Sequence, residues 1–408
     1  MDVVSMDKKE LFLEQFRVSE GVHGVSKSAE LALLELPFPN TREEYWKYTR
    51  LTKIQNGNFL LDENPSFEPI LTEFGDAFTF NCVNGFFEDS DVKLPIGVQS
   101  KVIEEIRDPL VEYQYEFFSA LNTAYFTSGI RIKLEPKMKL DKPILINFVS
   151  TGNAIQAQPR LEIVLGEGAS AAVIINFQNQ NATEHITNVV SEMKVSKNAS
   201  LQVHQLQQSG DDNYLINTTE VLQKRDSKFS IHTMSLEGKI LRNNLNIAVD
   251  GQNCETRLNG VYLVSGTQHV DNHTYVDHKK PNCNSSENYK GIIDDKATAV
   301  FNGKVMVQPD AQKINAFQSN QNILLSDDAT INSKPELEIY ADDVQCSHGS
   351  TTGQLDEEAL FYLRSRGVSE KSAKKMLIRA FVFDVLEEIE LEVFKYHVEG
   401  LVEEKFGV

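Results

Sequence analysis

The feature that most constrains the fold of this sequence is a long central stretch, residues 130–344, built from short β-like segments. Runs such as residues 144–149, 161–165, 172–177 and 300–307 alternate Val, Ile, Phe or Thr with polar residues. A period of two is typical of a strand with one buried face. No helical periodicity interrupts this stretch, so the sequence predicts a mainly β core.

Similar small, polar turns separate these segments. Each turn carries one small residue, and the series is Ala169, Ala199, Ser227, Cys254, Ala297, Ala311 and Ala329. The intervals between them range from 14 to 43 residues, so the repeat is loose. A β-sandwich also contains many short strands. A recurring small-residue turn after an aliphatic strand instead favours stacked coils, in which each strand pairs with its copy one coil along. We therefore predict a β-helix-like solenoid.

Helical patterns flank the central stretch. On the N-terminal side we expect a short helix at residues 8–16, a helix start with Thr41 and Glu44 as a capping box, and an amphipathic helix over residues 102–121. On the C-terminal side, Asp356 and Ser369 are the expected N-caps of two further helices. The predicted division is a helical or mixed N-terminal region at residues 1–125, a β-helix core at 126–348 and a C-terminal helical domain at 349–408. This last domain either caps the open end of the solenoid or forms a docking surface, because its apolar residues lie on more than one helix face.

Composition excludes several classes of function. The chain has 408 residues with 40 basic and 59 acidic side chains, a formal net charge of −19. Nucleic-acid grooves and anionic membrane surfaces both attract clustered Lys and Arg, so we expect neither as a partner. The N-terminus lacks a secretory h-region, and no window approaches the roughly 18 apolar residues of a spanning helix. We therefore expect a soluble, cytoplasmic protein without membrane insertion.

Several common catalytic motifs are also absent. The sequence contains no P-loop, no G-x-S-x-G and no H-E-x-x-H, which removes the usual nucleotide-hydrolase, serine-hydrolase and metalloprotease assignments. Four cysteines without a C-x-x-C pair provide neither a disulfide framework nor a zinc ribbon. Most of these cysteines are expected to be buried, reduced thiols.

One concentration of metal-competent groups lies between Gln268 and Cys283. His269, Asp271 and His273 would project from one face of an extended strand, with His278 and Cys283 further along. Imidazole, carboxylate and thiolate are ligands that iron or zinc accepts. The same two-residue spacing arises on any solvated strand face, so both interpretations stay open.

A second concentration lies at the junction between the β stretch and the helical tail. Cys346 and His348 are two residues apart and share a face in an extended segment. A protonated imidazole nearby would lower the pKa of the thiol and make it a better ligand or nucleophile. The alternative is a packed turn in which Gly349 serves the backbone geometry. Two ligands cannot complete a four-coordinate site, so a metal cluster here would need groups from elsewhere or from a second chain.

Three stretches carry a resemblance to a known family. Residues 39–49, residues 311–320 with 335–339, and residues 343–367 resemble the SufB/SufD family of SUF iron–sulfur cluster assembly proteins. Within this family, SufB-like members carry an H-E-A-type sequence where this chain has Cys-Ser-His-Gly at 346–349. The chain departs mildly from the family pattern at Phe317 and Ser350, and neither position is a proposed ligand.

The resemblance implies a fold, partners and a site. It implies a right-handed parallel β-helix with helical flanks, acting as a non-catalytic scaffold in a complex with a SufB-like paralogue and the ABC-type ATPase SufC. ATP hydrolysis would then belong to SufC, which would dock on the helices around residues 355–386. Cys346 and His348 would face SufB across the end of the β-helix and hold a transient iron–sulfur cluster with ligands that SufB supplies. The segment containing His269, Asp271, His273 and His278 matches the family too, without an assigned role.

Two alternatives remain at this stage. A β-helix carbohydrate-active enzyme, either a lyase or a glycosidase, would need carboxylates clustered on a groove, for which Asp342-Asp343 or Asp294-Asp295 are the candidates. Whether the isolated chain forms a homodimer also stays open at this stage, because the edge strands of a β-helix would permit pairing with another copy.

Overall fold

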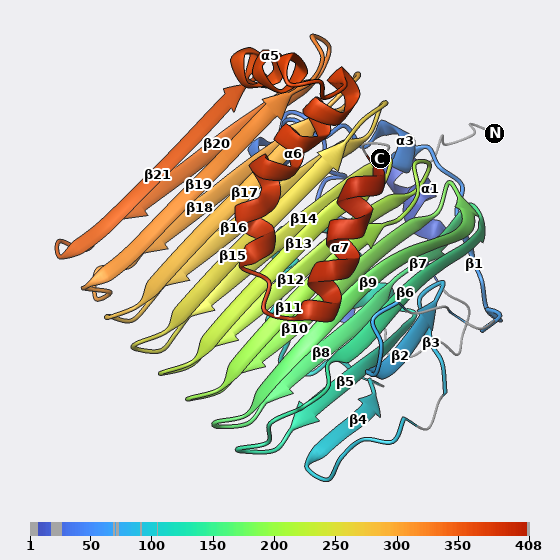
Figure 1. Ribbon diagram of the computed structural model, residues 1–408. Coiled ribbons are helices and arrows are strands. Elements are labelled where there is room, and N and C mark those ends of the chain that lie inside the picture. The colour runs from blue at the N-terminus through green and yellow to red at the C-terminus, as the bar shows by residue number, and fades with distance from the viewer. Residues whose placement is uncertain are drawn as a thin grey trace.

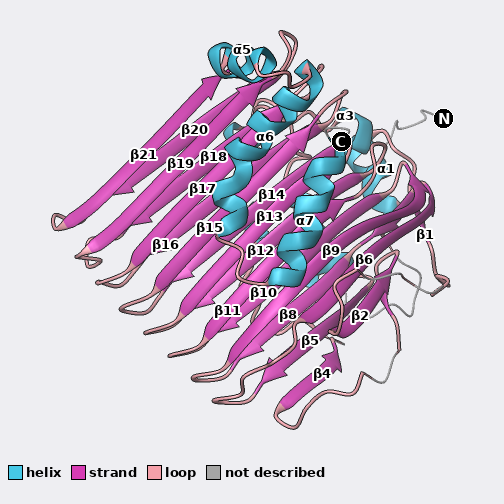
Figure 2. Cartoon of the chain, viewed as in Figure 1, coloured by secondary structure: helices cyan, strands magenta, loops and turns pink. Residues whose placement is uncertain are grey.

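The body of the molecule is a solenoid of two long sheets stacked face to face (Figures 1 and 2). The computed structural model describes residues 7–17, 27–67, 70, 73–89, 92–103 and 105–405. Within these residues the first sheet consists of β1 (Leu60–Leu61), β4 (Val98–Val102), β5 (Ser128–Leu134), β7 (Ile155–Ala157), β8 (Pro159–Leu165), β10 (Ile186–Val195), β12 (Tyr214–Gln223), β14 (Ile240–Val249), β16 (His269–His278), β18 (Thr298–Val307) and β20 (Thr330–Ile339). The second sheet consists of β2 (Phe78–Val83), β3 (Phe86–Phe87), β6 (Ile144–Asn153), β9 (Ser170–Thr183), β11 (Ser200–Gln208), β13 (Lys228–Glu237), β15 (Glu255–Val264), β17 (Asn284–Ile293), β19 (Ile314–Leu324) and β21 (Val344–Gly353).

Strand pairing confirms the β-helix and excludes the sandwich. From β8 to β21 the chain alternates between the sheets, and each strand pairs in parallel with the strand two further along. Apolar side chains of both sheets fill the space between them, from Ile132 and Ile146 near one end to Phe301 near the other. The sequence order therefore runs directly along the stack, as the colour gradient of Figure 1 shows.

The structure corrects the predicted repeat of small residues. Ala297 and Ala329 lie in turns that lead from the second sheet to the first, on the opposite edge of the solenoid from the other five marks. The predicted series also lacked one turn, at Cys283. The true series along one edge is Ala169, Ala199, Ser227, Cys254, Cys283, Ala311 and Ala341, at intervals of 27 to 30 residues.

A left-handed backbone residue precedes most of these small residues. The turn positions Gly168, Asn198, Asp226, Asn253 and Asn282 all have φ between 58° and 69°. Glycine, asparagine and aspartate adopt this region at the lowest steric cost. The buried small residue that follows fits the tight corner where successive coils stack, which explains the recurrence of Gly, Asn or Asp before Ala, Ser or Cys.

Helices cover both outer faces. On the first sheet lie α1 (Lys8–Glu14), α2 (Lys27–Glu35), the 3-10 turns η1 (Glu44–Trp46) and η2 (Tyr113–Tyr115), α3 (Thr52–Gln55) and α4 (Phe117–Tyr125), with their aromatic residues packed against β10, β12 and β14. On the second sheet lie α6 (Glu370–Glu387) and α7 (Glu392–Lys405), preceded by α5 (Glu357–Ser365). The predicted N-caps Asp356 and Ser369 are confirmed, because each side chain accepts a backbone N–H of its helix.

Two N-terminal predictions were wrong. Within residues 102–121, Val102 ends β4, and the helix begins only at Phe117, because Asp108 takes a left-handed conformation before Pro109. The expected capping box is also not formed. Asn40 instead accepts the Arg42 amide and donates to Glu43, so only a 3-10 turn follows.

The two ends of the solenoid differ. At the N-terminal end, β4 runs antiparallel to β5 and the β2–β3 hairpin ends the second sheet. At the C-terminal end, β20 and β21 are the last strands of their sheets among the described residues. The C-terminal helices do not cover this end. They lie across the outer face of the second sheet, where α6 packs on β15 and β17 (Figure 1). The capping alternative for the helical tail is therefore wrong.

Candidate functional site

Cys346 and His348 lie side by side on the last strand of the second sheet. Parallel register places Cys346 beside Ala316 and His348 beside Gln318 of β19. The inner face of β21 carries both residues, because Ala316 and Gln318 belong to the solenoid interior. Cys346 is half-buried and packs against the core, whereas His348 is exposed. The sequence prediction that the two side chains share a face is confirmed.

The environment of Cys346 differs from the one we expected. Burial raises the pKa of the Cys346 thiol, and the backbone amide of Ala316 offsets only part of that effect. The thiol is therefore protonated at neutral pH in the isolated chain. It would become a thiolate ligand only on metal binding, which displaces the proton.

The interior column that leads to His348 changes its chemistry near the open end. Following the register from β9 through β15, the inward residues are Val173, Val203, Ile231 and Leu258. The next three strands place Glu287, Gln318 and His348 in the same column. We call this set the Glu–Gln–His column. Glu287 and Gln318 are 5% and 4% exposed, so a carboxyl and an amide are buried where earlier coils hold aliphatic side chains.

Glu287 and Gln318 are in direct contact within the Glu–Gln–His column. Gln318 Nε2 donates to Glu287 Oε2 at 2.7 Å. Burial raises the pKa of the Glu287 carboxyl to about 7. Gly303 of β18 leaves room for the amide, because a Cβ at that position would come within 2.1 Å of Gln318 Nε2. Sequence reasoning did not single out Glu287 or Gln318. The available signal was that Glu287 and Gln318, like His348, stand at inward-facing positions of alternating strands.

A second polar network links the next two interior columns of the second sheet to Ser333 of β20. Asn320 Nδ2 donates to the Tyr262 hydroxyl at 2.9 Å, and Asn320 Oδ1 accepts from Asn322 and from Ser333 at 2.8 Å each. The Ser333 hydroxyl lies 2.7 Å from that of Ser350 on β21. Polar groups therefore continue through part of the interior up to β21, the strand that carries Cys346 and His348.

The segment around His269 forms an ion-pair network. His269, Asp271 and His273 share the outer face of β16, as their spacing indicated. Asp271, however, is bound by the Arg242 guanidinium of β14 and by the Thr49 hydroxyl, and His273 Nε2 lies 3.0 Å from Asp271 Oδ1. Although burial opposes ionisation, the Arg242 charge keeps the pKa of Asp271 below its ordinary value. The carboxylate is therefore already neutralised by a protein cation.

This network anchors the N-terminal segment. The Arg242 guanidinium also lies 4.5 Å from the ring centre of Tyr45 and 4.3 Å from that of Trp46. The remaining members of the predicted metal segment point elsewhere. His278 faces the interior, 2.9 Å from the Ser285 hydroxyl, and Cys283 belongs to the small-residue edge. Among the described residues no group of three or more His, Cys, Asp or Glu side chains is placed to hold a metal ion.

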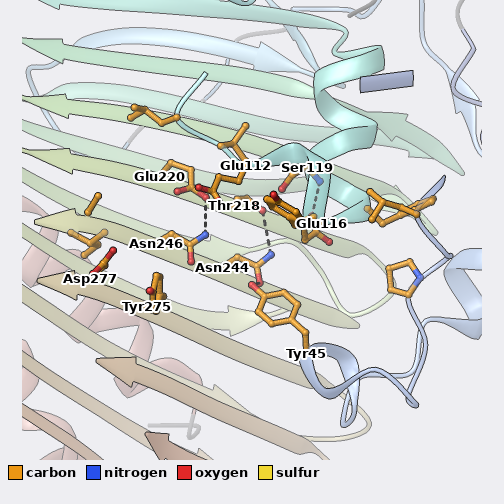
Figure 3. Close-up of a pocket in the computed structure, with 18 of the residues that line it drawn as sticks. Tyr45, Glu112, Glu116, Ser119, Thr218, Glu220, Asn244, Asn246, Tyr275 and Asp277 are labelled. Carbon is orange, nitrogen blue, oxygen red and sulfur yellow. Dashed lines mark hydrogen bonds between the residues drawn. The ribbon is translucent and has the colours of Figure 1, made fainter. Parts of the chain in front are cut away.

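An acid-lined cavity separates the N-terminal segment from the first sheet. Its volume is about 600 Å³, and Glu112, Glu116 and Glu220 line it together with Tyr45 and Asn246 (Figure 3). Asn246 donates to Glu220 at 2.7 Å, and burial raises the pKa of Glu220 to about 8. The Glu116 carboxylate accepts the Ser119 amide and thereby caps α4. The hydrogen bonds drawn in Figure 3 join Glu220 to Asn246, Thr218 to Asn244 and Glu116 to Ser119, so these polar groups already have partners within the chain.

The acidic pairs that a carbohydrate-active enzyme would use are far apart. Asp294 and Asp295 lie in the turn between β17 and β18, whereas Asp342 and Asp343 lie in the turn between β20 and β21. These two turns are on opposite edges of the solenoid. They therefore do not form the facing pair of carboxylates that glycoside hydrolysis needs.

The C-terminal helices expose apolar side chains. Phe361 and Tyr362 of α5 are 74% and 57% exposed, and Met376 and Phe383 of α6 are about half exposed. These four residues lie on the helices around residues 355–386, the segment predicted from the sequence as a docking surface, and Tyr396 of α7 is exposed as well. Separately, no helix among the residues that the structure describes is long and apolar enough to cross a bilayer.

Comparison with known proteins gives the family. Residues 148–381 match the model of the SUF system FeS cluster assembly SufBD core domain. The chain is 32% identical to the iron–sulfur cluster assembly protein SufD of Escherichia coli, over 90% of this chain and 89% of that protein. It is 32% identical to an iron–sulfur cluster assembly SufBD family protein of Synechocystis, over 87% of this chain and 85% of the relative. It is also 28% identical to the chloroplastic protein ABCI7 of Arabidopsis thaliana, over 93% and 86%. These matches confirm the family expected from the sequence, and the relatives include a SufD protein. The chain belongs to the SufB/SufD family of iron–sulfur cluster assembly proteins.

Proposed function

We propose that the chain is a scaffold subunit that holds a nascent iron–sulfur cluster together with a SufB-like partner. The observation that carries this proposal is the open end of the β-helix, where a thiol and an imidazole lie on the inner face of the last strand. Cys346 and His348 would supply two ligands, and the partner would supply the others across the interface. The cluster is cargo in this scheme, assembled at the contact and then passed on.

The exposed edge of β21 supports a partner at this end. Its outer backbone edge pairs with no further strand among the described residues, and most of its side chains are exposed. Unpaired edges of this kind promote pairing with another chain. The SufB-like partner would use this edge in the complex, and a second copy of this chain would use it when the protein is alone.

Energy coupling would come from the ATPase partner. The exposed apolar residues Phe361, Tyr362, Met376 and Phe383 offer a docking surface for a SufC-type ATPase. This division of labour agrees with the absence of a P-loop from the sequence. The chain itself would perform no catalytic step.

The test is cluster assembly in the reconstituted complex. The chain is co-expressed with a SufB-like protein and a SufC ATPase, purified without oxygen, and supplied with ferrous iron and sulfide. We expect the three proteins to co-elute and to develop the visible absorption of a bound cluster. His348→Ala should reduce the cluster yield at least about tenfold without changing co-elution, because it removes a ligand rather than a contact.

Ser347→Ala is the matched control. Ser347 is exposed and lies between the two proposed ligands, but its side chain points to the outer face of β21. This variant should form clusters as the unmodified chain does. A full cluster yield from His348→Ala would refute the assignment of the site, and failure of the proteins to co-elute would refute the partnership.

A further inference from the structure

We propose that Gln318 is a positioning residue for His348: its side-chain oxygen accepts the ring N–H of the imidazole and thereby fixes which ring nitrogen is free to bind the cluster. This inference rests on the proposed function and deepens it. It concerns the Glu–Gln–His column and adds two buried residues to a site that has so far comprised only Cys346 and His348.

The orientation of the Gln318 amide carries the argument. Its nitrogen donates to Glu287 on β17, the strand on one side of β19. The amide oxygen takes no part in this bond, so it is available to a donor from β21, the strand on the other side of β19. The residue that register places there is His348.

The Gln318 oxygen needs a donor. Gln318 is 4% exposed, and its Oε1 has no hydrogen-bond partner among the described residues. A buried amide oxygen without a donor is unfavourable, because it has given up its hydrogen bonds to water and gained none in return. The exposed imidazole of His348 can turn inward by rotation about its side-chain bonds, which brings a ring N–H to this oxygen. Ordering of the imidazole between the amide and a bound cluster would satisfy both groups.

Glu287 holds the nitrogen of the Gln318 amide on its own side. Its Oε2 accepts from Gln318 Nε2 whether the carboxyl is ionised or protonated, so the amide nitrogen stays on the Glu287 side. Gly303 allows the amide to sit there, since a Cβ would come within 2.1 Å of the nitrogen. Histidine ligands usually donate their second ring N–H to a carbonyl or carboxylate, and loss of that acceptor typically weakens metal binding 10–100-fold.

The first test reads the histidine tautomer directly. The full chain is labelled with ¹⁵N-histidine, and long-range ¹H–¹⁵N spectra are recorded near neutral pH, with His348→Gln used to assign the His348 signals. We expect one dominant His348 tautomer in the unmodified chain and a mixture in Gln318→Leu. The matched control is Gln205→Leu, a buried inward glutamine on β11, far from β21, which should leave the His348 signals unchanged.

The second test uses the co-expressed complex with ferrous iron and sulfide. Gln318→Leu should lose its cluster to a chelator about 10–100 times faster than the unmodified complex, and Gln318→Glu, which restores an acceptor, should recover part of that loss. A His348 tautomer mixture in the unmodified chain would overturn the inference, as would normal cluster retention in Gln318→Leu while His348→Ala loses the cluster. Retention in His348→Ala would instead overturn the proposed function itself.

Discussion

The N-terminal and C-terminal ends of this solenoid have the same coil architecture but different residues in the interior. Near the N-terminal end, antiparallel strands end both sheets, and the inward column begins with Phe78 and Ile144 and continues with Val173. Near the C-terminal end the same column holds Glu287 and Gln318, and the last strand is uncovered. Aliphatic coils stabilise the stack, whereas the polar coils sacrifice apolar packing to place hydrogen-bonding groups behind the exposed thiol and imidazole. This difference in the interior is what places the proposed site at the C-terminal end.

The largest expected effect on stability comes from placing a glutamine in the aliphatic part of the inward column. Ile231→Gln should lower the free energy of unfolding by about 3–5 kcal/mol, because it removes apolar packing and buries an unpartnered amide. The opposite change, Gln318→Leu, should cost no more than about 2 kcal/mol, since the lost bond to Glu287 is offset by apolar burial. Urea unfolding of both variants measures the contrast. Equal losses would show that the two parts of the column are energetically alike.

The next effect is the pH dependence that Glu287 confers. Burial raises the pKa of its carboxyl from 4.5 to about 7, so the folded chain holds this proton more tightly than the unfolded chain does. Stability from this group is fully present below about pH 4.5 and is lost as pH rises through 7. Glu287→Gln should therefore match the unmodified chain at pH 4.5 and exceed its free energy of unfolding by about 3 kcal/mol at pH 8. The urea midpoints at the two pH values provide the measurement, and an identical shift at both would contradict the assignment.

The smallest expected effect comes from replacing a cysteine by alanine, a change that can be made near either end of the solenoid. Cys82 on β2 is 1% exposed, whereas Cys346 on β21 is half-buried. Cys82→Ala should cost about 1–2 kcal/mol, because the vacated space is fully enclosed, and Cys346→Ala less than about 1 kcal/mol. Thermal unfolding of the two variants under reducing conditions tests this order. A larger loss at Cys346 would mean that the open end contributes more to stability than its exposure indicates.

The sequence was sufficient for the β-helix and for the face shared by Cys346 and His348. Both follow from a period of two, which is a local property of the chain. The same rule placed His269, Asp271 and His273 on one face. It could not show that Arg242, 29 residues before Asp271, occupies that carboxylate, because pairing between coils is a register property.

Other features needed three-dimensional information. The series of small residues looked irregular because it combined turns from the two opposite edges of the solenoid. Strand pairing is needed to see that Ala297 and Ala311 lie on different edges. Gln318 stood within a family-like motif, but its role depends on Glu287, which lies one coil away. The prediction of a helix over residues 102–121 was wrong for a local reason. It gave more weight to the spacing of apolar residues than to Pro109, which disfavours a helix at that point.

The edge formed by Ala169, Ala199, Ser227 and their successors limits how such a chain can change in length. Each small residue occupies the corner of one coil, so the molecule can grow or shrink by whole units of 27 to 30 residues without disturbing its neighbours. A single inserted residue within a strand would instead turn every later side chain of that strand to the other face. In β21 such an insertion would move Cys346 and His348 from the inner face to solvent. Insertions and deletions in relatives of this protein should therefore gather at the turns or come as complete coils.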